Sequence, residues 1–139
     1  MLITPEYISD LVNFYSNSLD PKWKFDPKAE DMRNLQVKGA AKAFNLLEKY
    51  NVALLADEVG MGKTIQSLAV CSALWNQKPN AKILIIAPRD EVATNWEKEY
   101  QTFISHHYRM NDNIVKSVIG NEPIKKMVYC HFHQEQAKL

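Results

Sequence analysis

The pattern of apolar and polar positions divides the first half of the chain into two helical segments. A Thr-Pro pair at residues 4–5 followed by apolar residues at helical spacing predicts a helix over residues 5–17. A second apolar stripe predicts a helix from about Asp31 to Tyr50. The residues between them, 16–28, are rich in Asn-Ser and Asp-Pro turn signals, so we expect a turn-rich connection there.

The next part of the chain alternates between short apolar runs and longer helical patterns. Continuous apolar runs at 52–56 and 82–87 predict strands buried on both faces of a parallel sheet. Helical patterns over 65–75 and 91–105 follow them. Strand, helix, strand, helix is the order typical of a parallel α/β fold. Residues 114–119 are a candidate third strand, and the pattern after residue 123 is ambiguous.

Composition adds limits to this picture. A chain of 139 residues that is 46% hydrophobic suits one compact domain. A net charge of +1 gives no global attraction to nucleic acid, so such a contact has to be local. Cys71 and Cys130 lie far apart, so we expect free thiols and no disulfide framework. No leader and no membrane-spanning run is evident, which predicts a soluble, intracellular protein without a membrane partner.

One loop contains the residues that suggest phosphate binding. It lies between the predicted strand 52–56 and the helix from 65, and it reads Asp57, Glu58, Val59, Gly60, Met61, Gly62, Lys63, Thr64. Glycines let a backbone curl so that N–H groups point at phosphate oxygens, and the following helix adds its positive end. Lys63 would reach the β- and γ-phosphates, and Thr64 offers a hydroxyl to Mg²⁺. The alternative is an ordinary strand-to-helix turn that happens to contain Lys-Thr.

Three segments together resemble one family. Asp57 stands where the general phosphate-loop pattern has glycine, and in this form the loop resembles the first motif of the Swi/Snf-like helicase-related ATPases. Residues 33–39 look like the upstream glutamine motif of that family, with Asn-Leu in place of its usual Pro and aromatic residue. Residues 83–88, followed by 95–99, look like its next motif. The resemblance spans about residues 31–103.

The resemblance implies a fold and a set of site residues. The family has two RecA-like lobes that bind ATP between them and move along double-stranded DNA. We therefore expect an α/β fold: a partial RecA-like P-loop lobe over 29–139 with a parallel β-sheet core flanked by helices, and an N-terminal helical accessory segment over 1–28. ATP and Mg²⁺ are the implied cofactors. Gln36 would contact the adenine base, residues 57–64 the nucleotide, Thr64 the metal, and Arg89 and Asn95 the DNA.

Hydrolysis needs further groups. The acidic Asp-Glu-x-His motif of the family has no match after residue 100, where the remaining acids are Asp112, Glu122 and Glu135. The second lobe, which in this family supplies arginines worth about 10³–10⁵ in rate, has no counterpart in the chain. We expect a fragment with no catalytic residues of its own, which binds ATP, hydrolyses little or none, and pairs with the missing lobe or another chain.

Two alternative functions fit the sequence to different degrees. The chain could be a non-catalytic interaction module that associates through an incompletely covered sheet. An unrelated P-loop kinase or GTPase is disfavoured because Asp57-Glu58 replaces small residues and no guanine-reading motif appears. The Cys130, His131 and His133 cluster lacks a fourth zinc ligand nearby and is better explained as part of a strand or tail.

Overall fold

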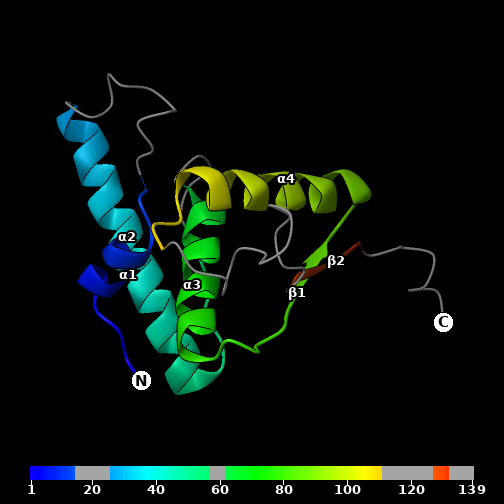
Figure 1. The fold of residues 1–139 in the computed structure, drawn as a ribbon, viewed down its shortest axis with the longest axis horizontal. Helices are drawn as coiled ribbons and strands as arrows, with labels where there is room; N and C mark the ends of the chain where they lie inside the picture. Colours follow the sequence, from blue (N-terminus) through cyan, green and yellow to red (C-terminus); the bar gives the residue numbers. More distant parts are fainter. Residues whose placement is uncertain (15–25, 57–61, 111–126, 132–139) are drawn as a thin grey trace.

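The computed structural model describes residues 1–14, 26–56, 62–110 and 127–131, the last of these as backbone only. Its elements are α1 (Pro5–Leu11), α2 (Pro27–Tyr50), α3 (Lys63–Gln77), β1 (Ile83–Ala87), α4 (Asp90–His106) and β2 (Met127–His131). In Figure 1, α2 and α3 run side by side with α1 against them. The same view places α4 across one end of α3, and β1 and β2 on the side away from α1. The helices predicted at 65–75 and 91–105 are confirmed as α3 and α4.

Local capping chemistry sets where the first two helices begin. The Thr4 hydroxyl accepts a hydrogen bond from the Tyr7 N–H (3.3 Å), and the Asp26 carboxylate accepts one from the Lys28 N–H (2.9 Å). A proline follows each cap, where its missing N–H has no helical partner to lose. α2 therefore begins earlier than the predicted start near residue 31. It ends at Tyr50, and the capping residue Asn51 adopts the left-handed conformation (φ 61°) common at helix ends.

The prediction that the first helix extends to residue 17 is wrong in its described part. α1 ends at Leu11, and Val12 forms an antiparallel bridge with Tyr108. The Asn13 N–H donates to the His107 carbonyl (2.7 Å), and the Arg109 N–H donates to the Leu11 carbonyl (2.9 Å). The segment after α4 thus provides backbone partners that compete with continuation of the helix.

The predicted strand at 52–56 is also wrong. These residues are assigned neither to a helix nor to a strand, and the side chains of Val52 and Leu54 are 67% and 84% exposed. A strand needs a neighbour that completes its hydrogen bonds, and no strand in the described part of the chain pairs with this segment. The candidate strand at 114–119 lies outside the described residues.

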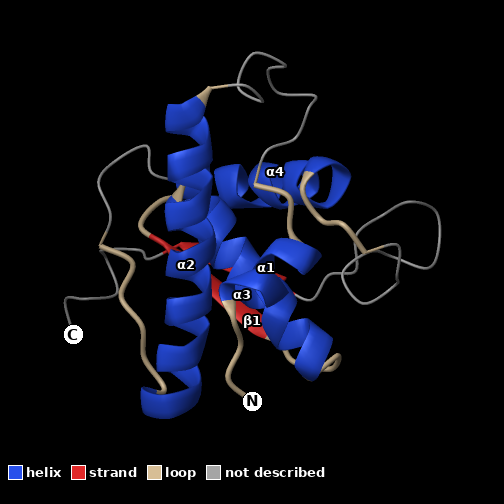
Figure 2. Cartoon of the chain, turned by 90° about the vertical axis from the view of Figure 1, so that its left-hand side faces the viewer, coloured by secondary structure: helices blue, strands red, loops and turns tan. Residues whose placement is uncertain are grey.

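The strand predicted at 82–87 is confirmed, but not its burial on both faces. β1 pairs in parallel with β2, with Ile83 opposite Met127 and Ala87 opposite His131. Along β1, Leu84 and Ile86 are 58% and 65% exposed, because no described element covers that face. The described residues are therefore mostly helical with one pair of parallel strands (Figure 2). A parallel-sheet core flanked by helices, as predicted, is not shown.

The core lies where the four helices meet. Its largest fully buried apolar side chains are Trp75, Phe44, Phe103, Ile8 and Leu68. The indole N–H of Trp75 donates to the Ala81 carbonyl (2.9 Å), and its ring lies 6.2 Å from that of Tyr100 in a tilted arrangement. This satisfies the one polar atom of the buried indole and ties the end of α3 to the connection that leads into β1.

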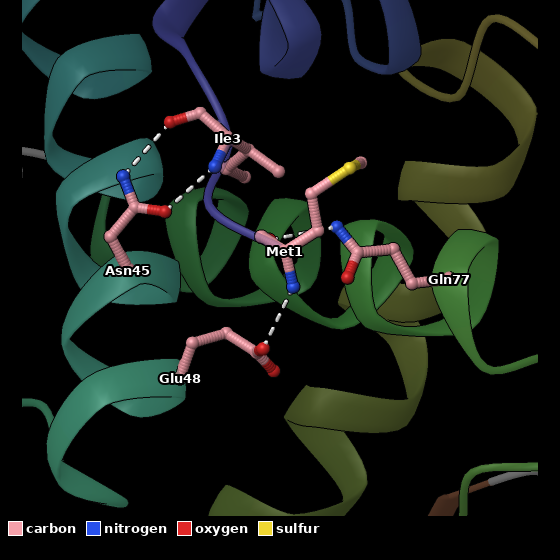
Figure 3. A network of polar contacts seen from close by, with 5 residues as sticks. All are labelled: Met1, Ile3, Asn45, Glu48 and Gln77. Carbon is pink, nitrogen blue, oxygen red and sulfur yellow. Dashed lines mark hydrogen bonds and ion pairs between the residues drawn. The ribbon is translucent and has the colours of Figure 1, made fainter.

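The first residues are held to α2 and α3 by polar contacts (Figure 3). The Asn45 side chain exchanges two hydrogen bonds of 2.8 Å with the backbone N–H and carbonyl of Ile3. The Met1 ammonium contacts the Glu48 carboxylate (3.0 Å), and the Gln77 amide donates to the Met1 carbonyl (3.3 Å). Ile3 is itself part of the core cluster. The predicted division into an accessory segment (1–28) and a nucleotide-binding lobe (29–139) stays a prediction.

Candidate nucleotide site

The site is centred on Gly62, the residue immediately before α3. Gly62 adopts the left-handed conformation (φ 71°, ψ 38°), and its carbonyl accepts the hydrogen bond from the Gln66 N–H (3.1 Å) that starts the helix. Glycine adopts this conformation without the steric cost that a Cβ brings. Lys63 and Thr64 are the first two residues of α3, and both are partly exposed. The predicted glycine, lysine and threonine therefore stand at the start of a helix.

The start of α3 differs electrostatically from those of the other described helices. Acidic residues lie in the first turns of α1, α2 and α4, whereas α3 has none there and begins with a lysine. No side chain caps α3 in the described part of the chain. A cation at the positive end of a helix dipole is unfavourable by about 0.3–1 kcal/mol. A bound phosphate would reverse this penalty, so the donors present here suit an anion.

Gln36 reaches this loop from α2. Gln36 is buried, with only 8% of its surface exposed, and its side-chain amide lies directly against Gly62. A Cβ placed on Gly62 would overlap Gln36 Nε2 and would lie 3.1 Å from Ile65 Cγ2. The structure thus brings together two of the predicted site segments, the glutamine motif and the end of the loop.

A second glycine–glutamine contact was missed by the sequence analysis. Gly39 of α2 lies against Gln66 of α3, where a Cβ on Gly39 would overlap Gln66 Oε1. Gln66 is 1% exposed. A signal was present, because glycine in a helix interior costs about 1 kcal/mol relative to alanine and often marks a close packing contact.

The other predicted site residues are placed differently. Asp57, Glu58, Val59, Gly60 and Met61 lie outside the described residues, so their role in nucleotide binding stays a prediction. Asp112, Glu122 and Glu135, which were not expected to form the acidic motif, also lie outside the described residues.

Arg89 immediately precedes α4 and Asn95 lies on it, and both residues are exposed. Asn95 lines a surface hollow of about 290 Å³ whose other lining residues are Asp90, Glu91, Thr94 and Lys98. Two carboxylates in this wall oppose the approach of phosphate groups to Lys98. DNA contact by Arg89 and Asn95 stays a prediction.

Two further features limit the chemistry of the described residues. Burial raises the pKa of the Cys71 thiol on α3 to about 12, so this group is not a thiolate nucleophile at neutral pH. In the described part of the chain, no cluster of three or more His, Cys, Asp or Glu side chains is arranged to hold a metal ion. None of the described helices has the length and apolar character needed to cross a membrane.

Most of the chain is similar in sequence to known proteins. Residues 35–139 match the SNF2-related domain family. The human chromodomain-helicase-DNA-binding protein 8 is 40% identical over 73 residues, which cover 52% of this chain and 3% of that protein. The rat chromodomain-helicase-DNA-binding protein 6 is 45% identical over 60 residues, covering 43% of this chain and 2% of that protein. No solved structure matches the chain.

The matched region contains Gln36, Gly62, Lys63 and Thr64, the residues that carry the helicase-related resemblance. The chain belongs to the SNF2-related domain family. This confirms the prediction that it resembles the N-terminal part of a Swi/Snf-like ATPase. It spans about 3% of the length of its chromodomain-helicase relatives.

Proposed function

We propose that this chain binds ATP with Mg²⁺ at the start of α3, as the first-lobe segment of a Swi/Snf-like DNA-dependent ATPase. The observation that carries the proposal is the contact of Gln36 with Gly62, directly before Lys63 and Thr64 at the start of α3, inside the region that matches the SNF2-related domain family. A glycine in the left-handed conformation, an uncapped helix start and a lysine are three independent features that favour a phosphate group.

Each residue has a distinct task in this proposal. The backbone N–H groups of the first turn of α3 bind phosphate oxygens, and Lys63 supplies a positive charge to the outer phosphates. The Thr64 hydroxyl is the protein ligand for Mg²⁺, which would neutralise charge on the phosphates. Gln36, with an amide that donates and accepts hydrogen bonds, is suited to the adenine edge.

Hydrolysis and movement along DNA belong to a complete protein in this proposal. A second lobe, or another chain, would close over the nucleotide and supply transition-state charge. Double-stranded DNA is the proposed partner of that complete protein, which we place inside the cell. The chain by itself is proposed to bind ATP weakly, because one side of the nucleotide stays in water.

The test is calorimetric titration of MgATP together with a phosphate-release assay. Lys63→Ala should weaken binding by about 10- to 100-fold, the loss expected for one hydrogen bond to a charged group. Lys42→Ala removes an exposed lysine from α2 and serves as the matched control, with binding unchanged. Absence of wild-type binding in a folded sample, or equal binding by both variants, would overturn the proposal.

One observation favours a second function, a non-catalytic interaction module. Four large apolar side chains in two short segments, Val52 and Leu54 in one and Leu84 and Ile86 in the other, expose between 58% and 84% of their surface. This function predicts association that does not depend on nucleotide and that Leu84→Ser weakens. Sedimentation of wild type and variant with and without MgATP separates the two functions, and a monomer under both conditions excludes self-association.

A further inference from the structure

The packing of α2 against α3 contains two reciprocal contacts between a glycine and a glutamine. Gln36 of α2 lies on Gly62 at the start of α3, and Gln66 of α3 lies on Gly39 of α2. Each helix therefore gives one glycine and receives the other helix's glutamine there. The two helices run side by side in the same direction (Figure 1), so the contacts lie one after the other along the seam.

The second contact leaves little room for adjustment. Both Gln36 and Gln66 are buried, at 8% and 1% exposure, and a Cβ on Gly39 would overlap Gln66 Oε1 while lying 3.5 Å from Gln66 Cδ. Ala40 and Ala69, close in sequence to this contact, are fully buried as well. Interiors packed at this density respond to an added methyl group by moving a side chain or a helix.

From this geometry we propose that the Gly39–Gln66 contact sets the register of α2 on α3 that keeps the Gln36 amide against Gly62. Gly39 and Gln66 are then positioning residues for the nucleotide site: they act through Gln36. The inference rests on the proposed function for its consequence in ligand binding, but the register itself is a property of the free protein.

The steric basis of the contact predicts a rescue. Gly39→Ala adds a methyl group where the Gln66 amide lies, and so forces α2 and α3 apart or displaces Gln66. Gln66→Ala removes the obstructing amide, so the double variant Gly39→Ala/Gln66→Ala regains the space and the register. A general loss of stability would not be reversed by this second truncation, because Gln66→Ala by itself also removes buried contacts.

The first measurement is made without nucleotide. The side-chain amide signals of Gln36 are identified in ¹H–¹⁵N spectra by their loss in Gln36→Ala. We expect them to shift in Gly39→Ala and to return toward their wild-type positions in the double variant. Unshifted signals in Gly39→Ala would overturn the proposal. So would a double variant that stays shifted or, where Gly39→Ala does not fold, a double variant that does not fold either.

The second measurement compares MgATP with magnesium tripolyphosphate, which lacks the base. Gly39→Ala should weaken MgATP binding about tenfold and tripolyphosphate binding by less than about twofold, since one hydrogen bond to the base is misplaced while the phosphate loop is kept. The double variant should recover base preference, and equal losses for both ligands would contradict the positioning role. If wild type binds neither ligand, the proposed function fails while the amide spectra still decide the register.

Discussion

Replacement of Gly62 by alanine tests the backbone geometry at the centre of the site. Gly62 has φ 71°, and an L-residue pays about 1–2 kcal/mol to adopt the left-handed conformation. The new Cβ would overlap the Gln36 amide and would lie 3.1 Å from Ile65 Cγ2, which adds an overpacking cost of about 1–3 kcal/mol. Alanine also reduces the entropy of the unfolded chain, which offsets about 0.4–1 kcal/mol. The free energy of unfolding should therefore fall by about 1–5 kcal/mol.

The cost of backbone strain and the cost of overpacking can be measured separately in a set of variants by urea denaturation. Gln36→Ala in the Gly62→Ala background removes the neighbour but keeps the backbone strain, so only the overpacking part should be recovered. Gly62→Asn keeps a Cβ but tolerates the left-handed conformation better than alanine, so it should recover part of the strain. Gly62→Ala with wild-type stability would refute the reasoning, because neither the strain nor the overlap would then exist. A full recovery by Gln36→Ala would refute the strain component alone.

Two further predictions concern contacts away from the site. Asn45→Ala removes both hydrogen bonds to the Ile3 backbone and should lower the free energy of unfolding by about 1–3 kcal/mol. Asn45→Asp keeps the acceptor for the Ile3 N–H but sets its second oxygen against the Ile3 carbonyl, so it should not restore wild-type stability; equal unfolding midpoints for all three proteins would contradict this. Burial lowers the pKa of His107, with His106 acting in the same direction and the Asn13 carbonyl and Glu99 opposing it. Because the pKa of His107 is lower in the folded state, the unfolded state binds the proton more readily. The contribution of neutral His107 to folding stability is therefore complete above the ordinary pKa of 6.5 and is lost as pH falls through the lowered pKa. Urea denaturation should show the free energy of unfolding decreasing as pH falls through this range. His107→Gln should remove this pH dependence, whereas the control His106→Gln, at an exposed position, should largely keep it.

Local features of the sequence predicted the start of α1 and the glycine turn before α3, whereas the Asp26-Pro27 cap that begins α2 was assigned to a turn-rich connection. Thr4-Pro and Asp26-Pro act within one helical turn, so a short stretch of sequence is enough to begin α1 and α2. Gly62 followed by Lys-Thr also carries its own conformational preference, and the structure has it at the start of α3. The family membership followed from such short motifs and is confirmed by the match over residues 35–139.

Features that depend on partners distant in sequence were not predictable in this way. The apolar run at 52–56 has the composition of a buried strand, but burial requires neighbours on its edges and faces, and the described elements do not provide them. The helical pattern after Leu11 is likewise interrupted because Tyr108 and His107 offer backbone partners to Val12 and Asn13. At 52–56 the apolar composition was not sufficient to predict a strand, and after Leu11 a distant segment decided the conformation.

The sequence alone determined the chemistry of the candidate site: a glycine able to take a positive φ, a lysine, a hydroxyl and a glutamine upstream. Only the tertiary structure decided that the glutamine lies on that glycine, and that Gly39 and Gln66 form a second contact beside it. The physical reason is the distance along the chain over which each property is set. Residue type and backbone preference are properties of a few neighbouring residues, whereas the meeting of two helices depends on how their surfaces pack along the whole seam.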